Sequence, residues 1–141
     1  MIYLDTSALV PYYYPEPLSA RVQQILQAQS QRVISEAVEV ELHSALARKV
    51  REHALTPSGA QRIATLFLRH VEDGIFSRLS LRSAHYRLAR EWIGRFDLPL
   101  RTLDALHLAT AAFESLPLVT ADEQLARSAS ILGIETIFLV E

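Results

Sequence analysis

The chain opens with the stretch IYLDTSAL, residues 2–9, in which a short apolar run meets an acid. The apolar residues favour β structure, and a polar turn expected at residues 5–7 ends the run. The pattern predicts a buried strand with Asp5 at its carboxyl end. Ligands of parallel α/β sheets bind beyond the carboxyl ends of the strands, so Asp5 is a candidate functional residue.

Strand and helix patterns alternate along the rest of the chain. Short apolar runs predict further strands at residues 32–35, 75–79, 118–120 and 134–139. Helical spacing of apolar residues, after a short first helix, predicts helices over 18–26, 36–53, 57 to about 73, 83–95, 103–113 and 122–132. The helix at 103–113 is apolar nearly all round and is expected to be buried. Such alternation implies an α/β fold with a parallel sheet covered by helices on both faces.

Composition indicates one globular domain. The chain has 141 residues, of which 50% are hydrophobic, and the absence of Cys excludes disulfide scaffolds, thiolate zinc sites and Cys nucleophiles. No basic leader precedes a long apolar stretch, and no apolar run approaches the ~18 residues that span a bilayer. We therefore expect a cytoplasmic protein without a membrane segment. A net charge of −2 argues against a uniformly basic nucleic-acid binder.

Four acids are expected to converge at one edge of this sheet. Asp5 follows the first strand, and Asp122 follows the strand at 118–120. Asp104 lies in the helix that leads into that strand, and Glu41 lies in the helix after the second strand. Carboxylates crowded together repel and raise one another's pKa unless a cation is present. Oxygen ligands without Cys favour a hard divalent ion, Mg²⁺ or Mn²⁺.

The helix at 36–53 offers three acids in its first two turns, and helical geometry separates them. At about 100° per residue, Glu41 falls within roughly 60° of Val38 and Ala45 on the stripe that faces the core. Glu36 lies on the far side, and Glu39 lies at the edge of the stripe. Glu41 is therefore the acid predicted to point inward.

Each acid also has a purely structural interpretation. Asp5 could start a turn or cap the following helix. Asp104 and Asp122 could complement the dipoles of the helices that they begin, and Glu41 could pair with an arginine.

Hydroxyl side chains stand beside two of the acids. Ser7 and Thr120 are candidates to hold water at a metal or to orient a carboxylate, and ordinary turn and cap hydroxyls are the alternative. Residues 120–123 also fit a capping box in which Thr120 and Glu123 are the partners.

With these residues in view, the chain resembles the PIN (PilT N-terminus) domain ribonucleases, most closely the VapC-type toxins of prokaryotic toxin–antitoxin pairs. The resemblance covers nearly the whole chain. It rests on residues 2–9, on Ser35 with Glu41 and the following Leu42, Ala45 and Leu46, on residues 101–109 and on residues 118–122. Four such segments in this order are strongly specific.

The resemblance implies a single PIN-like domain over residues 1–141, with a central parallel five-stranded sheet of order 3-2-1-4-5. It implies that Asp5, Glu41, Asp104 and Asp122 are the family's catalytic acids around Mg²⁺ or Mn²⁺. It also implies RNA products with 5′-phosphate and 3′-hydroxyl ends, a small cognate antitoxin that covers the site, and homodimers that join into larger complexes.

The predicted function is a metal-dependent endoribonuclease, the toxin of a type II toxin–antitoxin pair, in which the metal activates water for in-line attack on an RNA phosphodiester. Two alternatives remain. A PIN-fold binding module without catalysis is disfavoured by the presence of all four acids. A phosphatase of the haloacid-dehalogenase type needs a second Asp two residues after the first, and Ser7 stands there.

Three further features are candidates for roles around the site. His107 lies one turn after Asp104 and is a candidate general base, although a structural role is favoured because a metal lowers the pKa of its water without it. The tyrosines at 12–14 could stack on bases, receive apolar side chains of a partner, or simply pack. Residues 78–101 hold six Arg against Glu91 and Asp97, so this segment is predicted to follow the RNA backbone, with a solvated face as the alternative.

Overall fold

The computed structural model describes all 141 residues of the chain. Five strands and seven helices follow one another largely in the predicted alternation. Their bounds are β1 (Ile2–Leu4), α1 (Thr6–Tyr13), α2 (Ser19–Gln27), β2 (Arg32–Ser35), α3 (Glu36–Arg51), α4 (Pro57–Glu72), β3 (Ser77–Leu79), α5 (Ser83–Ile93), α6 (Thr102–Phe113), β4 (Leu118–Thr120), α7 (Glu123–Ile131) and β5 (Thr136–Phe138).

The five strands form one parallel sheet of order β3-β2-β1-β4-β5, as the resemblance implies. β1 lies at its centre: Tyr3 pairs with Val33 of β2 on one side and with Leu118 of β4 on the other. The backbone N–H of Asp5 extends this pairing with a 3.2 Å bond to the carbonyl of Val119. The carboxyl ends of β1 and β4 are therefore fixed side by side.

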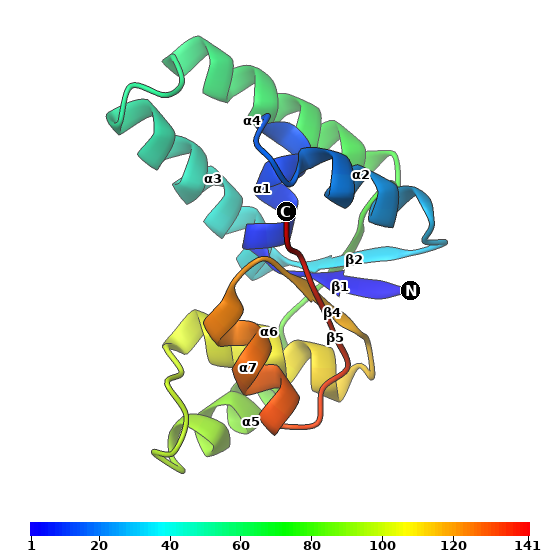
Figure 1. Cartoon of the computed structure of the whole chain (residues 1–141), viewed down its shortest axis with the longest axis vertical. Helices are drawn as coiled ribbons and strands as arrows, with labels where there is room; N and C mark the ends of the chain where they lie inside the picture. Colours follow the sequence, from blue (N-terminus) through cyan, green and yellow to red (C-terminus); the bar gives the residue numbers. More distant parts are fainter.

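Helices cover both faces of the sheet, which confirms the predicted α/β layering (Figure 1). Helices α1 to α4 lie on one side, with α3 and α4 forming a long pair at one end of the molecule. Helices α5, α6 and α7 lie on the other side. Each crossover returns the chain to the same edge, so every strand ends toward the same region.

The core lies between the sheet and these two helical layers. All three residues of β1 are buried, and α6 is buried at every position from Ala105 to Ala111, as its apolar sequence predicts. A second, smaller apolar cluster joins α5 to α6 through Ala89 and Leu106. Because α6 is held from both sides, its first turn is a rigid platform at the sheet edge.

The start of α1 differs from the prediction of a polar turn at residues 5–7. The Asp5 side chain accepts a bond from the N–H of Ala8 at 3.2 Å and caps the helix, which begins directly at Thr6. The interpretation of Asp5 as a helix cap is thus confirmed as a local role.

Two strands are shorter than predicted, because a hydrogen bond that closes the preceding helix end engages the first residue of each predicted strand. The N–H of Ile75 bonds the carbonyl of His70 at 2.9 Å, so β3 begins only at Ser77. The N–H of Ile134 bonds the carbonyl of Ala129 at the same distance, 2.9 Å, so β5 begins only after residue 135.

The capping box predicted for Thr120 and Glu123 is wrong. Asp122 is the cap of α7, and its Oδ1 accepts a bond from the N–H of Leu125 at 3.1 Å. Glu123 instead pairs with Arg127 one turn later, at 2.6 Å. Asp122 directly precedes the first residue of α7 and is therefore at the N-cap position. Thr120 is still part of β4 and cannot cap the helix.

No helix in the fold combines the length and the apolar character that a crossing of a membrane requires.

We expect the substitution Leu108→Ala to lower the free energy of unfolding by about 2–5 kcal/mol, since it leaves a cavity in the core. Leu108 is fully buried at 0% exposure, whereas Leu103 on the same helix is 41% exposed. Leu103→Ala is therefore the matched control, with an expected loss of less than about 1 kcal/mol. Urea denaturation followed by circular dichroism measures both, and equal losses would contradict the burial of α6.

Candidate active site

Four carboxylates lie at the carboxyl edge of the sheet, and three of them lie near one histidine. Asp5 and Asp122 follow the neighbouring strands β1 and β4, while Glu41 and Asp104 lie in early turns of α3 and α6. The Nε2 atom of His107 bonds Glu41, and His107 interacts electrostatically with Asp5 and Asp104. The structure thus brings together the four acids that the sequence singles out.

Asp5 is the most buried of these acids, with 4% of its surface exposed. Its Oδ1 accepts a bond from the Ser7 hydroxyl at 2.7 Å, and its Oδ2 accepts one from the Thr120 hydroxyl at 2.9 Å. No lysine or arginine pairs with it. Burial raises the pKa of Asp5 to about 6, against the opposing effects of His107 and of the hydrogen bonds.

Ser7 and Thr120 direct their hydroxyl protons to Asp5 because their oxygens accept bonds from elsewhere. The Ser7 oxygen accepts the N–H of Ala121 at 2.8 Å, and the Thr120 oxygen accepts the N–H of Asp122 at 3.0 Å. The two hydroxyl oxygens lie 3.2 Å apart. Of the roles considered for these hydroxyls, the geometry therefore favours orienting a carboxylate.

Glu41 points into the site, as the helical phase predicts. Its Oε1 accepts bonds from the Thr6 hydroxyl, at 2.9 Å, and from Nε2 of His107. Burial raises the pKa of Glu41, but the bonds from His107 and Thr6 outweigh burial and leave this pKa below its usual range. Glu36 is exposed, and Glu39 pairs with Arg78 of β3 at 2.6 Å.

His107 is held in place by a chain of hydrogen bonds that starts at the amino end of α3. Ser35, the cap of α3, bonds the Tyr3 hydroxyl at 2.9 Å, and the Tyr3 hydroxyl bonds Nδ1 of His107 at 2.8 Å. Every group is satisfied when Nε2–H donates to Glu41 and Nδ1 accepts from Tyr3. Both ring nitrogens are engaged, so the geometry favours the structural role of His107 over a free general base.

Asp104 and Asp122 lie close enough to repel each other. Burial raises the pKa of Asp104, and the charge of Asp122 raises it further, while the backbone N–H of Arg101 partly offsets both. Both acids also serve the helices that they begin, as the structural interpretation predicts: Asp122 caps α7, and Asp104 lies in the first turn of α6. These local roles leave the repulsion between them in place.

A sequence model of the PIN domain matches residues 2–130 of the chain. The chain belongs to the PIN domain family. Ribonuclease VapC46 of Mycobacterium tuberculosis (strain ATCC 25618 / H37Rv) is a homologue, 30% identical over an alignment of length 139 that covers 96% of this chain and 95% of that protein.

Solved structures share this PIN fold. The sarcin-ricin-loop-cleaving toxin VapC20 of M. tuberculosis superimposes with a TM-score of 0.73 and 16% identity, covering 91% of this chain and 95% of its own. VapBC2 of Rickettsia felis, bound to a DNA fragment from its promoter, gives a TM-score of 0.73 and 17% identity, covering 99% of this chain and 100% of the matched chain. At these identities the likeness establishes the fold alone.

The acidic side chains at this site of the PIN domain are chemically suited to bind a hard divalent cation. Carboxylate oxygens are the ligands that Mg²⁺ and Mn²⁺ prefer, and the chain has no Cys. A cation would relieve both the repulsion between Asp104 and Asp122 and the unfavourable burial of the Asp5 charge. No three His, Asp or Glu side chains stand together closely enough to form a ready-made metal cage. Glu41, for example, is turned toward Thr6 and His107.

Tyr3 and Thr6 are part of this PIN site, although neither was predicted to have a role there. Both belong to the opening stretch, and Tyr3 lies two residues before Asp5 in an extended segment, so the two side chains share one face. A phenol in an otherwise aliphatic buried strand is the signal that could have identified Tyr3, because a buried hydroxyl needs a partner.

In metal-free protein, we expect Asp5→Asn to raise the melting temperature at pH 8 by several degrees. The pKa of Asp5 rises from 3.8 to about 6 on folding, so the ionised group destabilises the fold above pH 6. The penalty is on the order of 3 kcal/mol there and disappears as the pH falls toward 4. Thermal melts in EDTA across this range measure the difference from wild type.

The matched control for this substitution is Asp97→Asn, which removes a half-exposed acid paired with Arg95. It should show no comparable trend with pH. A lower melting temperature of Asp5→Asn at pH 8 would contradict the unfavourable burial of this charge.

Proposed function

We propose that this protein is a metal-dependent endoribonuclease and the toxin of a type II toxin–antitoxin pair, with residues 1–141 forming one nuclease domain that acts in the cytoplasm. The observation that carries the proposal is that Glu41, Asp104 and Asp122 lie at the same sheet edge as the buried Asp5, which pairs with no lysine or arginine. Membership of the PIN family and homology to a VapC ribonuclease support it.

In this proposal Asp5, Glu41, Asp104 and Asp122 hold Mg²⁺ or Mn²⁺. The bound cation supplies positive charge that favours deprotonation of an attacking water and stabilises the departing oxygen. Ser7 and Thr120 fix the orientation of Asp5 through their hydroxyls.

Glu41 is oriented separately, by the Thr6 hydroxyl and by His107. His107 is itself fixed through Tyr3, so the buried hydrogen-bond chain holds this acid at the rim of the site. The hydrogen bonds thus orient two of the four carboxylates, Asp5 and Glu41, before RNA arrives.

The phosphatase alternative lacks its second carboxylate. Ser7 stands two residues after Asp5, and its hydroxyl binds Asp5 instead of presenting an acid. The presence of all four acids argues against a binding module without catalysis.

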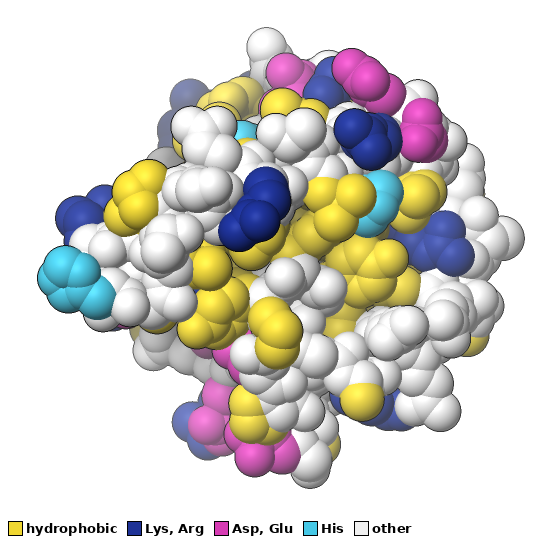
Figure 2. Space-filling view, turned by 90° about the horizontal axis from the view of Figure 1, so that it is seen from above, with side chains coloured by type: hydrophobic (Ala, Val, Ile, Leu, Met, Phe, Trp, Pro, Cys, Tyr) yellow, Lys and Arg dark blue, Asp and Glu magenta, His cyan; other side chains and the backbone are white.

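The antitoxin is proposed to bind a groove between α1, α2 and α4. This groove has a volume of about 360 Å³ and includes Tyr12, Tyr13, Leu66 and His70 in its lining. Figure 2, which looks onto the end of the molecule that carries α3 and α4, shows hydrophobic side chains gathered near the middle of this face. The VapBC2 pair of Rickettsia felis is a neighbour of the same fold.

The tyrosines of α1 both pack and line this groove. Tyr12 and Tyr13 meet edge to face at 4.9 Å, and the Tyr13 hydroxyl bonds Nδ1 of His70 at 2.6 Å. Tyr14 lies apart, beneath the ammonium of Lys49. Packing of α1 is therefore confirmed, and we propose that the outer surfaces of Tyr12 and Tyr13 receive apolar side chains of the antitoxin.

We expect Glu41→Gln to reduce the rate of RNA cleavage in Mg²⁺ by roughly 100-fold or more, because it removes a charged metal ligand. Asp5→Asn, Asp104→Asn and Asp122→Asn should do the same, and EDTA should abolish cleavage by the wild type. Incubation with total RNA, followed by mapping of the cut ends, measures the activity.

Glu36→Gln and Glu39→Gln are the matched controls, since both are glutamates in the first turn of α3. Their activity should stay within about twofold of wild type, because Glu36 is exposed to solvent and Glu39 pairs with Arg78 outside the acidic site. Equal losses in all three glutamate variants would mean that the assigned orientation of α3 is not what matters for activity.

We expect the protein expressed alone to arrest growth, and co-expression of the adjacent short reading frame to restore growth through a stable complex. Leu66→Asp should weaken that complex by about tenfold or more, because it places a charge in an apolar groove. Leu68→Asp is the control: both leucines are 42% exposed on α4, but only Leu66 lines the groove.

Co-purification measures these complexes. Equal loss or equal retention in both leucine variants would place the partner elsewhere. Normal growth with the unpaired wild type would remove the toxin role and leave the nuclease proposal standing.

A further inference from the structure

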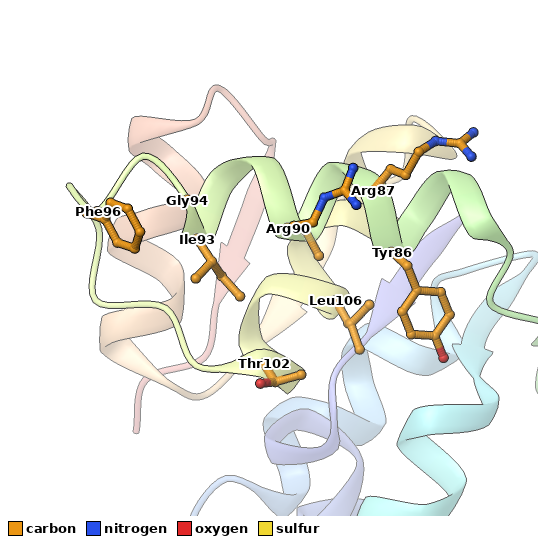
Figure 3. A pocket seen from close by; sticks show the side chains of 9 residues that line it. Tyr86, Arg87, Arg90, Ile93, Gly94, Phe96, Thr102 and Leu106 are labelled. Atoms are coloured by element: carbon orange, nitrogen blue, oxygen red, sulfur yellow. The ribbon is translucent and has the colours of Figure 1, made fainter.

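A second hollow lies on the other side of the molecule, between α5 and the first turns of α6 (Figure 3). Its volume is about 500 Å³, within the range of small-ligand sites. The lining includes Tyr86, Arg87, Arg90, Ile93, Phe96 and Leu106. The lining contains two arginines and no carboxylate.

Two exposed aromatic rings stand at opposite ends of this pocket (Figure 3). Tyr86 is 54% exposed and Phe96 is 89% exposed. Phe96 has a positive φ of 54°, a conformation that is uncommon for a residue with a side chain. Together with the apolar lining between them, the two rings form a contiguous apolar surface of the kind that marks a binding site.

The six arginines of residues 78–101, the segment predicted to follow the RNA backbone, fall into two groups. Three of its six arginines are paired with acids: Arg78 with Glu39, Arg82 with Glu114, and Arg95 with Asp97.

The other three, Arg87, Arg90 and Arg101, form no ion pair. Arg87 and Arg90 extend from α5 along the rim of the pocket opposite Thr102 (Figure 3). Two of the three unpaired arginines of this segment therefore line the pocket that carries the two exposed rings.

Helix α6 connects the pocket with the acidic site. Thr102 and Leu106 line the pocket, while Asp104 and His107 of the same helix belong to the acidic site. Arg101, at the start of α6, lies close enough to Asp104 to act on its ionisation. The amino end of α6 therefore adjoins both the pocket and the acids.

We propose that this pocket binds a nucleotide of the single-stranded RNA substrate outside the cleaved bond. A base stacks on Tyr86 or Phe96, and the flanking phosphates meet Arg87, Arg90 and Arg101. Aromatic platforms beside unpaired guanidinium groups are the arrangement that binds single strands without reading their sequence. The inference rests on the proposed ribonuclease function, because it assigns part of that enzyme's substrate to this surface.

Binding of a fluorescein-labelled single-stranded RNA to the Asp5→Asn protein in EDTA tests the pocket apart from cleavage. Adding Arg87→Gln and Arg90→Gln should weaken binding about tenfold and reduce the salt dependence by roughly 0.7 per lost phosphate contact. Adding Tyr86→Ala and Phe96→Ala should also weaken binding, with the salt dependence unchanged.

The matched control adds Arg62→Gln and Arg69→Gln, two exposed arginines of α4 that also form no ion pair. These should change the affinity less than twofold. Equal loss in both arginine pairs, or no loss in either, would overturn the pocket assignment. So would a change of particle mass in the Tyr86→Ala and Phe96→Ala protein by sedimentation, since the pocket would then be a contact between copies.

The same variants separate this inference from the function on which it rests. A wild type that does not cleave RNA in Mg²⁺ contradicts the proposed function, whatever the binding results. A wild type that cleaves, combined with pocket variants that bind RNA normally, contradicts only the pocket. Preference of the pocket for an acidic peptide over RNA in competition would also overturn it.

Discussion

The burial of a carboxylate at the end of the central strand is the constraint on which the rest of the site depends. A buried carboxylate needs hydrogen-bond donors, and the hydroxyls of Ser7 and Thr120 supply them to Asp5. These two residues are 113 positions apart in the chain and meet because β1 pairs directly with β4. Both hydroxyls can therefore reach Asp5 only when β1 and β4 are neighbours in the sheet. The strand order is thus required for the orientation of this acid.

Helix α6 has three roles. Its middle is buried between the sheet and α5, its first turn presents Asp104 to the other acids, and Leu106 forms part of the pocket beside α5. Helical geometry places these roles on different faces of α6, because residues two apart, such as Asp104 and Leu106, lie on nearly opposite faces. The apolar character that makes α6 easy to recognise in the sequence is also what keeps Asp104 and His107 in fixed positions.

The parallel sheet and its helical layers could be predicted because they depend on local patterns, namely apolar runs and helical spacing. The four acids could be predicted from their positions after strands and in helices next to them, whereas the strand order was implied only by the resemblance to the PIN family. The inward orientation of Glu41 follows from helical phase alone. The contacts could not be predicted in the same way. Tyr3 and His107 are 104 positions apart, and Arg78 meets Glu39 only because β3 pairs beside β2. The starts of β3 and β5 were predicted too early because a bond at the preceding helix end engages Ile75 and Ile134. The start of α7 was assigned the wrong cap because Asp122, and not Thr120, caps this helix.

The shortness of α1 has a geometric consequence for any inhibitor that reaches both ends of it. Asp5 caps its first turn, and Tyr12 and Tyr13 in its last turn line the groove. With eight residues at about 1.5 Å each, the helix spans about 12 Å. An extended peptide covers that distance in about four residues. The length of α1 therefore fixes the spacing, in a blocking peptide, between an apolar anchor in the groove and a basic side chain that reaches the acids.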